Sequence, residues 1–383
     1  MLTAGHVIRW TADTFLAAAT VGSLYLLIAG VLLIRYRTSG SRQLARAVPV
    51  TILVPLCGRE PGLLLRLRAL CDQDYAAPVQ IICGVRSPDD PAIEIVRSIA
   101  VERTDRRIDL CIDPLVHGRN LKISNLINMA PRARHDTLVL IDSDIEVGPD
   151  YLSKVVAALQ QPGVGAVTCL YHGLAAGGIW ARLAAMGINT HFLPNVMVAL
   201  ATGLGRPCFG STIAISRDTW RRIGGFRAFA DHLWDDYAIG EAVRGLGYKV
   251  VVPDFALGHV CSDVSARQLF AGQLRYARTI KSIDPAGHAG GIITHPFPLA
   301  LLGFLCGGGG QAVALMVAAL ICRYILCWQV ERRFNTMATD YWLVPLRDLL
   351  SFVVYVASFF GATVKWRGHR YRVIDRTLVT DSH

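Results

Sequence analysis

Aspartate pairs occur at three places in the middle of the chain, and an arginine-rich segment, residues 273–278, follows them. The pairs are Asp89–Asp90, Asp142 and Asp144 with one serine between them, and Asp235–Asp236. Carboxylates bind divalent cations or accept protons from hydroxyl groups, and arginine forks bind phosphate oxygens. Because this stretch lies between apolar segments, the pattern predicts chemistry on a diphosphate at a membrane surface.

Asp142 and Asp144 stand directly after the apolar run 137–141. Side chains two residues apart in an extended chain point to the same side, so both carboxylates can face one cation. A hard cation such as Mg²⁺ or Mn²⁺ prefers carboxylates together with substrate phosphate oxygens. A solvated turn is the alternative, because Asp-Ser-Asp also suits turns. The position after an apolar strand favours the metal site.

Asp235 and Asp236 precede a helical stretch, residues 237–245. An aspartate at the start of a helix can serve only as a cap. In the functional interpretation, one carboxylate is a general base that deprotonates an acceptor hydroxyl while that hydroxyl attacks a sugar. Two adjacent carboxylates can divide capping and catalysis, and we predict that Asp236 is the base.

Five further residues are candidates for contacts with the substrate. Lys122 and Asn125 share a helix face at i and i+3, where Lys122 could contact a phosphate or be an ordinary surface lysine. Arg275 and Arg278 share another helix face and could hold a diphosphate, or contact lipid headgroups instead. Gly210 could let the backbone approach the substrate, or mark a plain turn.

The composition predicts a membrane protein. Of 383 residues, 52% are hydrophobic and 18% are charged, which is too apolar for an ordinary soluble enzyme. The net charge is +10, and basic stretches at 35–46, 275–281 and 365–376 flank apolar segments, as expected on the cytoplasmic side. They do not interleave with a nucleic-acid-binding motif, which argues against nucleic acid as a partner. Ten cysteines without zinc spacing indicate reduced, buried thiols.

Apolar segments frame the predicted domains. Residues 14–34 form a retained anchor, and 178–204, broken by polar residues, form an interfacial segment or a buried helix. Residues 298–328 are one long span or two short pieces, and 343–364 are a further span. We therefore predict an N-terminal anchor at 1–36, a cytoplasmic catalytic domain with interfacial helices at 37–285, and two C-terminal transmembrane helices with a basic tail at 286–383.

Short apolar runs alternate with helical stretches between the anchor and the third aspartate pair. The expected strands are 49–55, 79–85, 107–112 and 137–141, and the expected helices are 62–72, 91–101 and 121–129. This alternation predicts an α/β fold with a mostly parallel sheet that helices cover on both faces. Ligands of such sheets bind outside the carboxyl ends of the strands, where residues 87–90 and 142–144 fall.

The ordered set of motifs resembles the membrane-anchored, inverting glycosyltransferases with a GT-A fold that include ceramide glucosyltransferase. The likeness runs from about residue 50 to 278 and returns at 366–372. It is carried by residues 89–93, 122–126, 141–144, 224–226 and 235–237. Within this group the chain looks most similar to the bacterial hopanoid-biosynthesis-associated glycosyltransferase, on residues 116–120, 125–129, 230–233 and 275–280.

The resemblance assigns roles to most of the aspartates. The second family aspartate matches Asp142, with Asp144 completing the metal pair, and the third matches Asp236. The first family aspartate falls on Ser87, so Asp89 or Asp90 must serve in its place, or the uridine is held otherwise.

The last family signature, Gln/Arg-x-x-Arg-Trp, is altered in this chain. Arg275 is kept, Tyr276 replaces the tryptophan and Gly272 replaces the first residue. Gln273 could substitute from one position away, although helical geometry would point it elsewhere. These positions, with Arg278, are the predicted contacts to nucleotide and acceptor.

The resemblance implies a UDP-sugar donor, a divalent metal and a membrane lipid acceptor at the cytoplasmic face of a bacterial inner membrane. For the hopanoid branch, the donor is UDP-N-acetylglucosamine and the acceptor is a bacteriohopanetetrol hydroxyl. The rival hypotheses are glucose transfer to ceramide or diacylglycerol, processive polysaccharide synthesis, and an inactive membrane-bound lipid-binding scaffold. A transporter is poorly supported, because most polar residues lie in one large soluble stretch.

Overall fold

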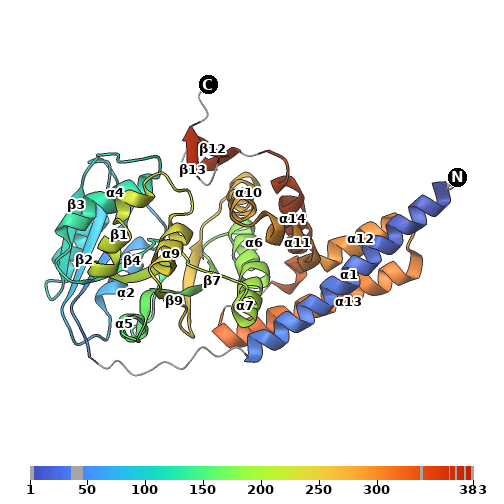
Figure 1. Cartoon of the computed structure of the whole chain (residues 1–383), viewed down its shortest axis with the longest axis horizontal. Helices are drawn as coiled ribbons and strands as arrows, with labels where there is room; N and C mark the ends of the chain where they lie inside the picture. Colours follow the sequence, from blue (N-terminus) through green and yellow to red (C-terminus); the bar gives the residue numbers. More distant parts are fainter. Residues whose placement is uncertain are drawn as a thin grey trace.

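The computed structural model describes residues 4–35, 46–336, 340–361, 363–366, 369–374 and 377–380. An α/β part and a group of long helices lie at opposite ends of the molecule (Figure 1). The helices between them, α6 (Ile179–Gly187), α7 (Leu193–Thr202), α10 (Ala266–Ile283) and α14 (Val344–Ser358), join the two parts (Figure 1).

Seven strands form the central sheet in the order β3-β2-β1-β4-β8-β6-β9. Their bounds are β1 Val50–Pro55, β2 Val79–Val85, β3 Arg107–Ile112, β4 Thr137–Ile141, β6 Val164–Thr168, β8 Thr212–Ser216 and β9 Lys249–Val251. Only β8 runs antiparallel to its neighbours in this sheet. The predicted mostly parallel α/β sheet is therefore confirmed, and the four strands expected from the sequence are present.

Strands β1 and β2 are buried along their whole length because helices cover both faces of the sheet. Ile52 and Val54 pack into one core and Leu53 packs into the other, as alternation along a strand requires. The first core includes side chains of α2 (Leu63–Cys71), α3 (Ala92–Glu102) and α5 (Tyr151–Leu159), and the second those of α4 (Leu121–Met129) and α9 (Asp235–Gly245). A strand in this position must be apolar at nearly every residue.

A small second sheet fixes the segment that follows β4. It contains β5 (Ile145–Glu146), β10 (Ala256–Cys261) and β7 (Leu170–Ala175), with β10 in the centre. The backbone N–H of Val260 in β10 donates to the Asp144 carbonyl at 2.9 Å. The Asp-x-Asp segment is thus held between the end of β4 and a strand that enters from a distant part of the chain.

Among the described residues, four helical segments are long and apolar enough to cross a membrane: Arg9–Arg35, Ile179–Thr202, Gly309–Phe334 and Tyr341–Ser358. A pair, Pro285–Thr294 and Pro296–Leu305, bent by 69°, would be a fifth span. The segment expected at 298–328 is divided between α12 (Pro296–Leu305) and α13 (Gly309–Phe334), which favours two pieces. The segment expected to lie at the interface, 178–204, contains one of these four, Ile179–Thr202. It consists of α6, the π-helix η2 (Ile188–Phe192) and α7.

Helix α1 (Ala4–Arg35) packs along α12 and α13 (Figure 1). Part of the predicted basic tail forms a three-stranded antiparallel sheet of β11 (Thr363–Trp366), β12 (His369–Ile374) and β13 (Thr377–Thr380). The predicted domain boundaries at residues 37 and 286 stay predictions.

Candidate functional site

Carboxylates from two of the three aspartate pairs meet around Lys122 at the carboxyl end of β4. The Lys122 Nζ lies 2.6 Å from Asp142 Oδ1 and 4.0 Å from Asp235 Oδ2. Burial opposes the charged form of the lysine, but Asp142, Asp235 and Asp236 together raise the pKa of its ammonium group. The lysine therefore stays protonated as a fixed positive charge among the carboxylates.

Gly210, just before β8, brings its backbone into the middle of this cluster. Its N–H donates to Asp236 Oδ2 at 2.9 Å. A Cβ at this position would lie 3.4 Å from each of Asp142 Oδ2, Asp236 Oδ2 and Lys122 Nζ. A side chain larger than a methyl group would enter the space between the charged groups. The predicted approach of this backbone to substrate stays a prediction.

Asp236 has the electrostatic setting of a general base. Burial, followed by the adjacent Asp235 carboxylate, raises the pKa of Asp236 to about 6, while Lys122 and the Tyr237 N–H work in the opposite direction. A base titrating near neutral pH is largely deprotonated there, yet it holds a proton more strongly than an ordinary aspartate.

Asn120 positions two members of the cluster, and the sequence analysis did not single it out. Its Oδ1 accepts from the N–H groups of Lys122 and Ile123, at 3.0 and 3.1 Å, and so caps α4. Its Nδ2 donates to Asp235 Oδ1 at 3.0 Å. The only sequence signal for this residue is its place before a helix, which reveals the cap but not the second partner.

Asp144 has an unused oxygen beside Asp142. Its Oδ2 lies 3.7 Å from His259 Nε2, whereas its Oδ1 is buried and has no hydrogen-bond partner in the described part of the chain. No group of three or more His, Cys, Asp or Glu side chains among the described residues is arranged to hold a metal ion. Mg²⁺ commonly binds one or two carboxylates plus substrate phosphates, so Asp142 and Asp144 fit such an ion when a diphosphate supplies the other ligands.

Two tyrosines border the carboxylates. Burial raises the pKa of Tyr171. It is raised further by nearby groups, which are Tyr276, Asp236, Asp144 and Asp142, so this ring lies near the carboxylates. The Arg275 guanidinium lies 4.6 Å from the centre of the Tyr276 ring. Tyr276 was a predicted contact, whereas nothing in the sequence pattern distinguished Tyr171 in β7.

The first aspartate pair has structural partners. Both oxygens of Asp90 accept from the Gly58 N–H at 3.0 Å, and Oδ1 also accepts from the Ala92 N–H at 2.9 Å, so this residue fixes the loop after β1 and the start of α3. Asp89 is exposed. Asn125 is buried and donates to the Gly84 carbonyl at 2.8 Å. Substrate contacts for these three residues stay predictions.

Two other predicted substrate ligands on α10 face the C-terminal helices. Gln273 Oε1 accepts a hydrogen bond from Arg347 of α14. Arg278 donates to the backbone carbonyls of Phe360 and Thr363. In this structure both side chains join α10 to the C-terminal part of the chain. Tyr276, between them in sequence, lies near Asp144 and Asp142, and Arg275 packs on its ring.

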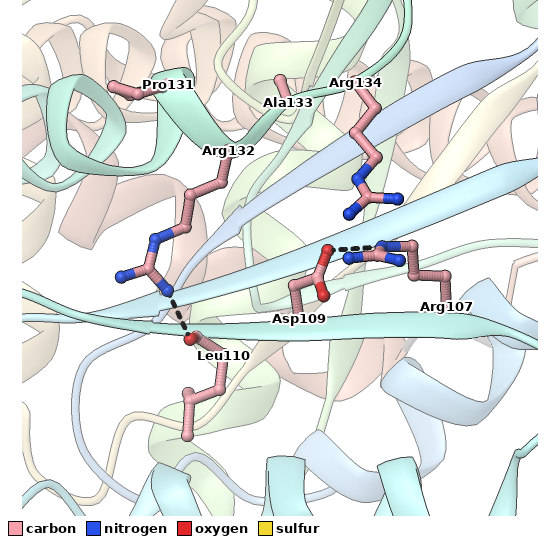
Figure 2. A pocket seen from close by; sticks show the side chains of 7 residues that line it. All are labelled: Arg107, Asp109, Leu110, Pro131, Arg132, Ala133 and Arg134. Atoms are coloured by element: carbon pink, nitrogen blue, oxygen red, sulfur yellow. Dashed lines mark hydrogen bonds and ion pairs between the residues drawn. The ribbon is translucent and has the colours of Figure 1, made fainter.

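A cavity of about 390 Å³ lies elsewhere, at the start of β3 and the loop before β4 (Figure 2). It is lined by Arg107, Asp109, Leu110, Pro131, Arg132, Ala133 and Arg134. Arg107 pairs with Asp109 at 2.9 Å and Arg132 donates to the Leu110 carbonyl at 2.8 Å. These residues are at the amino ends of the strands, opposite the carboxylate cluster, and include none of the predicted site residues.

The chain is similar to known glycosyltransferases. Its sequence matches the profile of glycosyl transferase family 21 over residues 14–379. Ceramide glucosyltransferase 1 of Caenorhabditis elegans is 22% identical over 205 residues, which are 53% of this chain and 43% of that protein. Ceramide glucosyltransferase of Komagataella phaffii is 33% identical over 118 residues, 29% of this chain and 23% of that protein. The chain thus spans less than half the length of either relative.

One solved structure resembles nearly the whole chain. The mannosyltransferase PcManGT from Pyrobaculum calidifontis, in complex with GDP-Man and Mn²⁺, has a TM-score of 0.53 and 20% identity, covering 92% of this chain and 99% of that one. This likeness supports the GT-A fold expected from the motifs. Because the family match extends over almost the entire sequence, the chain belongs to glycosyl transferase family 21.

Proposed function

We propose that the protein transfers a sugar from a UDP-sugar to a hydroxyl group of a membrane lipid. The observation that carries this proposal is the convergence of Asp142, Asp235 and Asp236 around Lys122 at the carboxyl end of β4. Ligands of α/β sheets bind at that edge. Helices long enough to cross a membrane adjoin this part of the molecule and would bring the lipid to it.

The proposed reaction is a single displacement with inversion. Asp236 accepts the proton of the acceptor hydroxyl, whose oxygen forms a bond to the anomeric carbon as the bond to the diphosphate oxygen breaks. Lys122 and Arg275 provide positive charge for the departing diphosphate. A divalent cation held by Asp142 and Asp144 would neutralise further negative charge on this leaving group.

The finer proposal is N-acetylglucosamine as the sugar and bacteriohopanetetrol as the acceptor, at the cytoplasmic face of a bacterial inner membrane. It is supported by the sequence motifs at 116–120 and 230–233. The alternative is glucose transfer to ceramide, which the names of the two relatives favour. The inactive scaffold is less favoured, because aspartates and a lysine meet at the edge of the sheet where ligands of this kind of fold bind.

The test uses the purified full-length protein in detergent, with Mn²⁺ and each pairing of two donors and three acceptors. The donors are UDP-N-acetylglucosamine and UDP-glucose, and the acceptors are bacteriohopanetetrol, ceramide and diacylglycerol. We expect an N-acetylhexosamine adduct of bacteriohopanetetrol by mass spectrometry, together with UDP release. Glucosylceramide as the main product would select the alternative. If no pairing gives lipid-dependent UDP release, the glycosyltransferase proposal fails for these substrates and the scaffold hypothesis gains support.

A further inference from the structure

Two buried arginines lie among the apolar helices. In the first, each guanidinium nitrogen has a hydrogen-bond or ion-pair partner. Arg323 of α13 is 1% exposed. Its Nε lies 3.1 Å from Asp348 Oδ1, and its two terminal nitrogens donate to the carbonyls of Thr190 and Thr294, both at 2.7 Å. Thr190 lies in the π-helix and Thr294 at a helix end, where backbone carbonyls need partners. Arg323 therefore has a structural role.

The second arginine, Arg347 of α14, is only partly satisfied. It is 3% exposed, and one terminal nitrogen donates to Gln273 Oε1. Its Nε and Nη1 have no hydrogen-bond partner in the described part of the chain. A buried charged donor without an acceptor costs several kcal/mol, so an oxygen from outside the chain is expected at these two nitrogens.

The surroundings of Arg347 leave room for its guanidinium. They also contain more positive than negative charge. A Cβ on Gly187, at the end of α6, would lie 2.4 Å from Arg347 Nη2, so a side chain there would displace the guanidinium. The nearby carboxylate, Asp348, pairs with Arg323 and lies 3.3 Å from His191 Nε2. Two guanidinium groups thus lie near a single carboxylate, which Arg323 already pairs with, and this favours a ligand atom at Arg347 that carries negative charge or a free lone pair.

Helix α10 and strand β10 relate Arg347 to the carboxylate site. Arg347 donates to Gln273, which lies one helical turn before Tyr276 on α10, so the guanidinium lies near the helix that carries the predicted substrate contacts.

On β10, His259 lies 3.7 Å from Asp144, and Cys261 is two residues further on, so the two side chains share a face of the strand about 7 Å apart. Burial raises the pKa of the Cys261 thiol to about 12; Asp263 and Asp144 also raise it, and the Arg347 guanidinium lowers it, which agrees with a position of Arg347 on the same side of the molecule.

We propose that Arg347 binds an oxygen of the headgroup of the lipid acceptor, close to the hydroxyl that receives the sugar, and that Gln273 orients its guanidinium. The inference rests on the proposed function and adds an acceptor-binding residue to it. The chemistry recognised is a hydrogen-bond-accepting oxygen in a low-dielectric setting, which a lipid hydroxyl or a lipid phosphate can supply.

The binding test needs no turnover. Native mass spectrometry in detergent would compare retention of diacylglycerol and of phosphatidic acid with identical tails by the wild type, Arg347→Gln and Arg182→Gln. Arg182 is a matched control, because it is an arginine on α6 whose side chain is 51% exposed. We expect Arg347→Gln to weaken retention of at least one lipid about tenfold, as for the loss of one or two charge-assisted hydrogen bonds, and the control to match the wild type.

The two lipids distinguish the source of the oxygen. A loss confined to phosphatidic acid assigns a phosphate, and a loss that includes diacylglycerol assigns a hydroxyl. Retention of both lipids by Arg347→Gln at wild-type levels overturns the proposal, and so does a wild type that retains neither.

Two further variants separate binding from mere support of α10. Gly187→Ala should displace the guanidinium and weaken retention as Arg347→Gln does, while the charge is kept. Gln273→Leu keeps both nitrogens and removes only the group that orients them, so its effect should be smaller than that of Arg347→Gln; a larger effect would mean that Arg347 acts only through Gln273.

Turnover gives a second readout in the active protein. We expect Arg347→Gln to raise the KM of the lipid acceptor about tenfold and to leave the KM of the UDP-sugar unchanged. A rise in the donor KM alone would contradict the acceptor assignment. A wild type that retains lipid through Arg347 but transfers no sugar would reject the proposed function and keep this site.

Discussion

Two groups of charged side chains in this molecule have opposite charge surpluses. In the carboxylate cluster, Asp142, Asp235 and Asp236 surround the single ammonium group of Lys122, and Asp144 lies near Asp142. In the arginine cluster, Arg323 and Arg347 lie near a single carboxylate, that of Asp348, which pairs with Arg323. The negative surplus of the first cluster favours cations and protons, and the positive surplus of the second favours oxygen atoms that accept hydrogen bonds.

The sign of the surplus charge, more than the individual residue types, indicates which kind of ligand each cluster suits. Both clusters contain paired charges, and in each one charged group is incompletely paired among the described residues: Asp144 at Oδ1 in the first and Arg347 at Nε and Nη1 in the second. A sugar transferase that works on lipids needs both kinds of site, since its donor carries a diphosphate and its acceptor carries hydroxyl or phosphate oxygens.

The largest effect is expected at the proposed base of the carboxylate cluster. Asp236→Asn keeps the size of the side chain but removes its ability to accept a proton, so turnover should fall about 10³-fold or more. UDP binding, measured by calorimetry with Mn²⁺, should stay near the wild-type value. Turnover within tenfold of the wild type would reject Asp236 as the base.

Within the arginine cluster, loss of the shared carboxylate should destabilise the protein. Asp348→Asn leaves Arg323 buried without its counter-ion, which typically costs about 3–5 kcal/mol. The apparent melting temperature in detergent should therefore drop clearly, as measured by intrinsic fluorescence. The double variant Arg323→Met with Asp348→Leu should recover part of the loss, because the charge of Arg323 is then removed together with that of its partner. An unchanged melting temperature in Asp348→Asn would show that the pair adds little.

Asp144 tests whether the negative surplus holds a metal. Asp144→Ala removes one of the two adjacent carboxylates, so Mn²⁺-dependent UDP binding should weaken at least about tenfold. Binding measured without the metal should change little. The metal assignment is contradicted if the variant binds UDP as tightly as the wild type when Mn²⁺ is present.

The pH dependence tests how strongly the carboxylates influence one another. Asp236 must be deprotonated to accept a proton, and its pKa is raised to about 6, so kcat/KM should decline as the pH falls through about 6. Lys122→Met removes a charge that lowers this pKa, and the decline should then begin at higher pH. A wild-type profile that stays flat down to pH 5 would exclude this titration.

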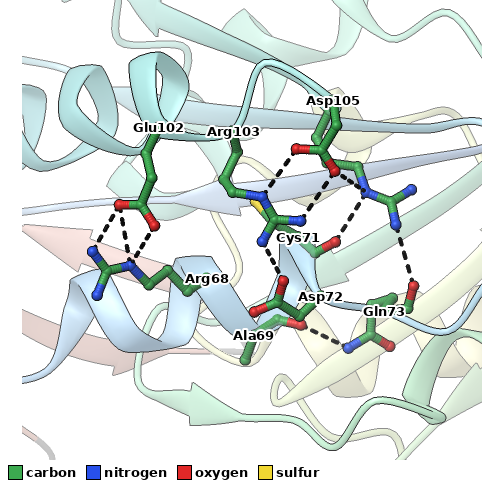
Figure 3. A network of polar contacts seen from close by, with 9 residues as sticks. Arg68, Ala69, Cys71, Asp72, Gln73, Glu102, Arg103 and Asp105 are labelled. Atoms are coloured by element: carbon green, nitrogen blue, oxygen red, sulfur yellow. Dashed lines mark hydrogen bonds and ion pairs between the residues drawn. The ribbon is translucent and has the colours of Figure 1, made fainter.

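The smallest effect is expected from charged groups at the surface. Arg68 and Glu102 pair at 2.7 Å near the network of Arg103 with Asp72 and Asp105 (Figure 3). Their side chains are 40% and 42% exposed, so water already solvates them well. Arg68→Gln should shift the melting temperature by less than about 2 °C. A drop as large as that of Asp348→Asn would show that burial does not set the strength of these pairs.

Much of the fold could be predicted from the sequence, because its local signals agree with the tertiary structure. The runs 79–85 and 137–141 are strands with those bounds, since strands covered on both faces must be largely apolar. The run 107–112 is also a strand with the expected bounds, at the edge of the sheet, where charged and partly exposed residues are tolerated. The apolar run ends at residue 141, so the carboxylates at 142 and 144 could be placed directly after a strand. Only the match over residues 14–379 shows the family directly, and the hopanoid assignment stays a proposal.

The partners of individual side chains could not be predicted. The sequence suggested that Gln273 and Arg278 contact substrate. In the structure their side chains bind parts of the chain more than 70 positions further on, Gln273 a side chain of α14 and Arg278 two backbone carbonyls that follow this helix. Asn120 reaches Asp235 across 115 residues. Such pairings follow from how helices pack after the chain has folded, and no local periodicity encodes them.

The amino-acid sequence by itself determined the alternation of strands and helices, the apolar segments and the positions of the acidic pairs, because each depends on residues a few places apart. The tertiary structure alone places Lys122 and Gly210 among those carboxylates, and buries Arg347 with two nitrogens that find no partner among the described residues. Burial and charge balance depend on every element that packs around a group, so they exist only once the whole chain is in place.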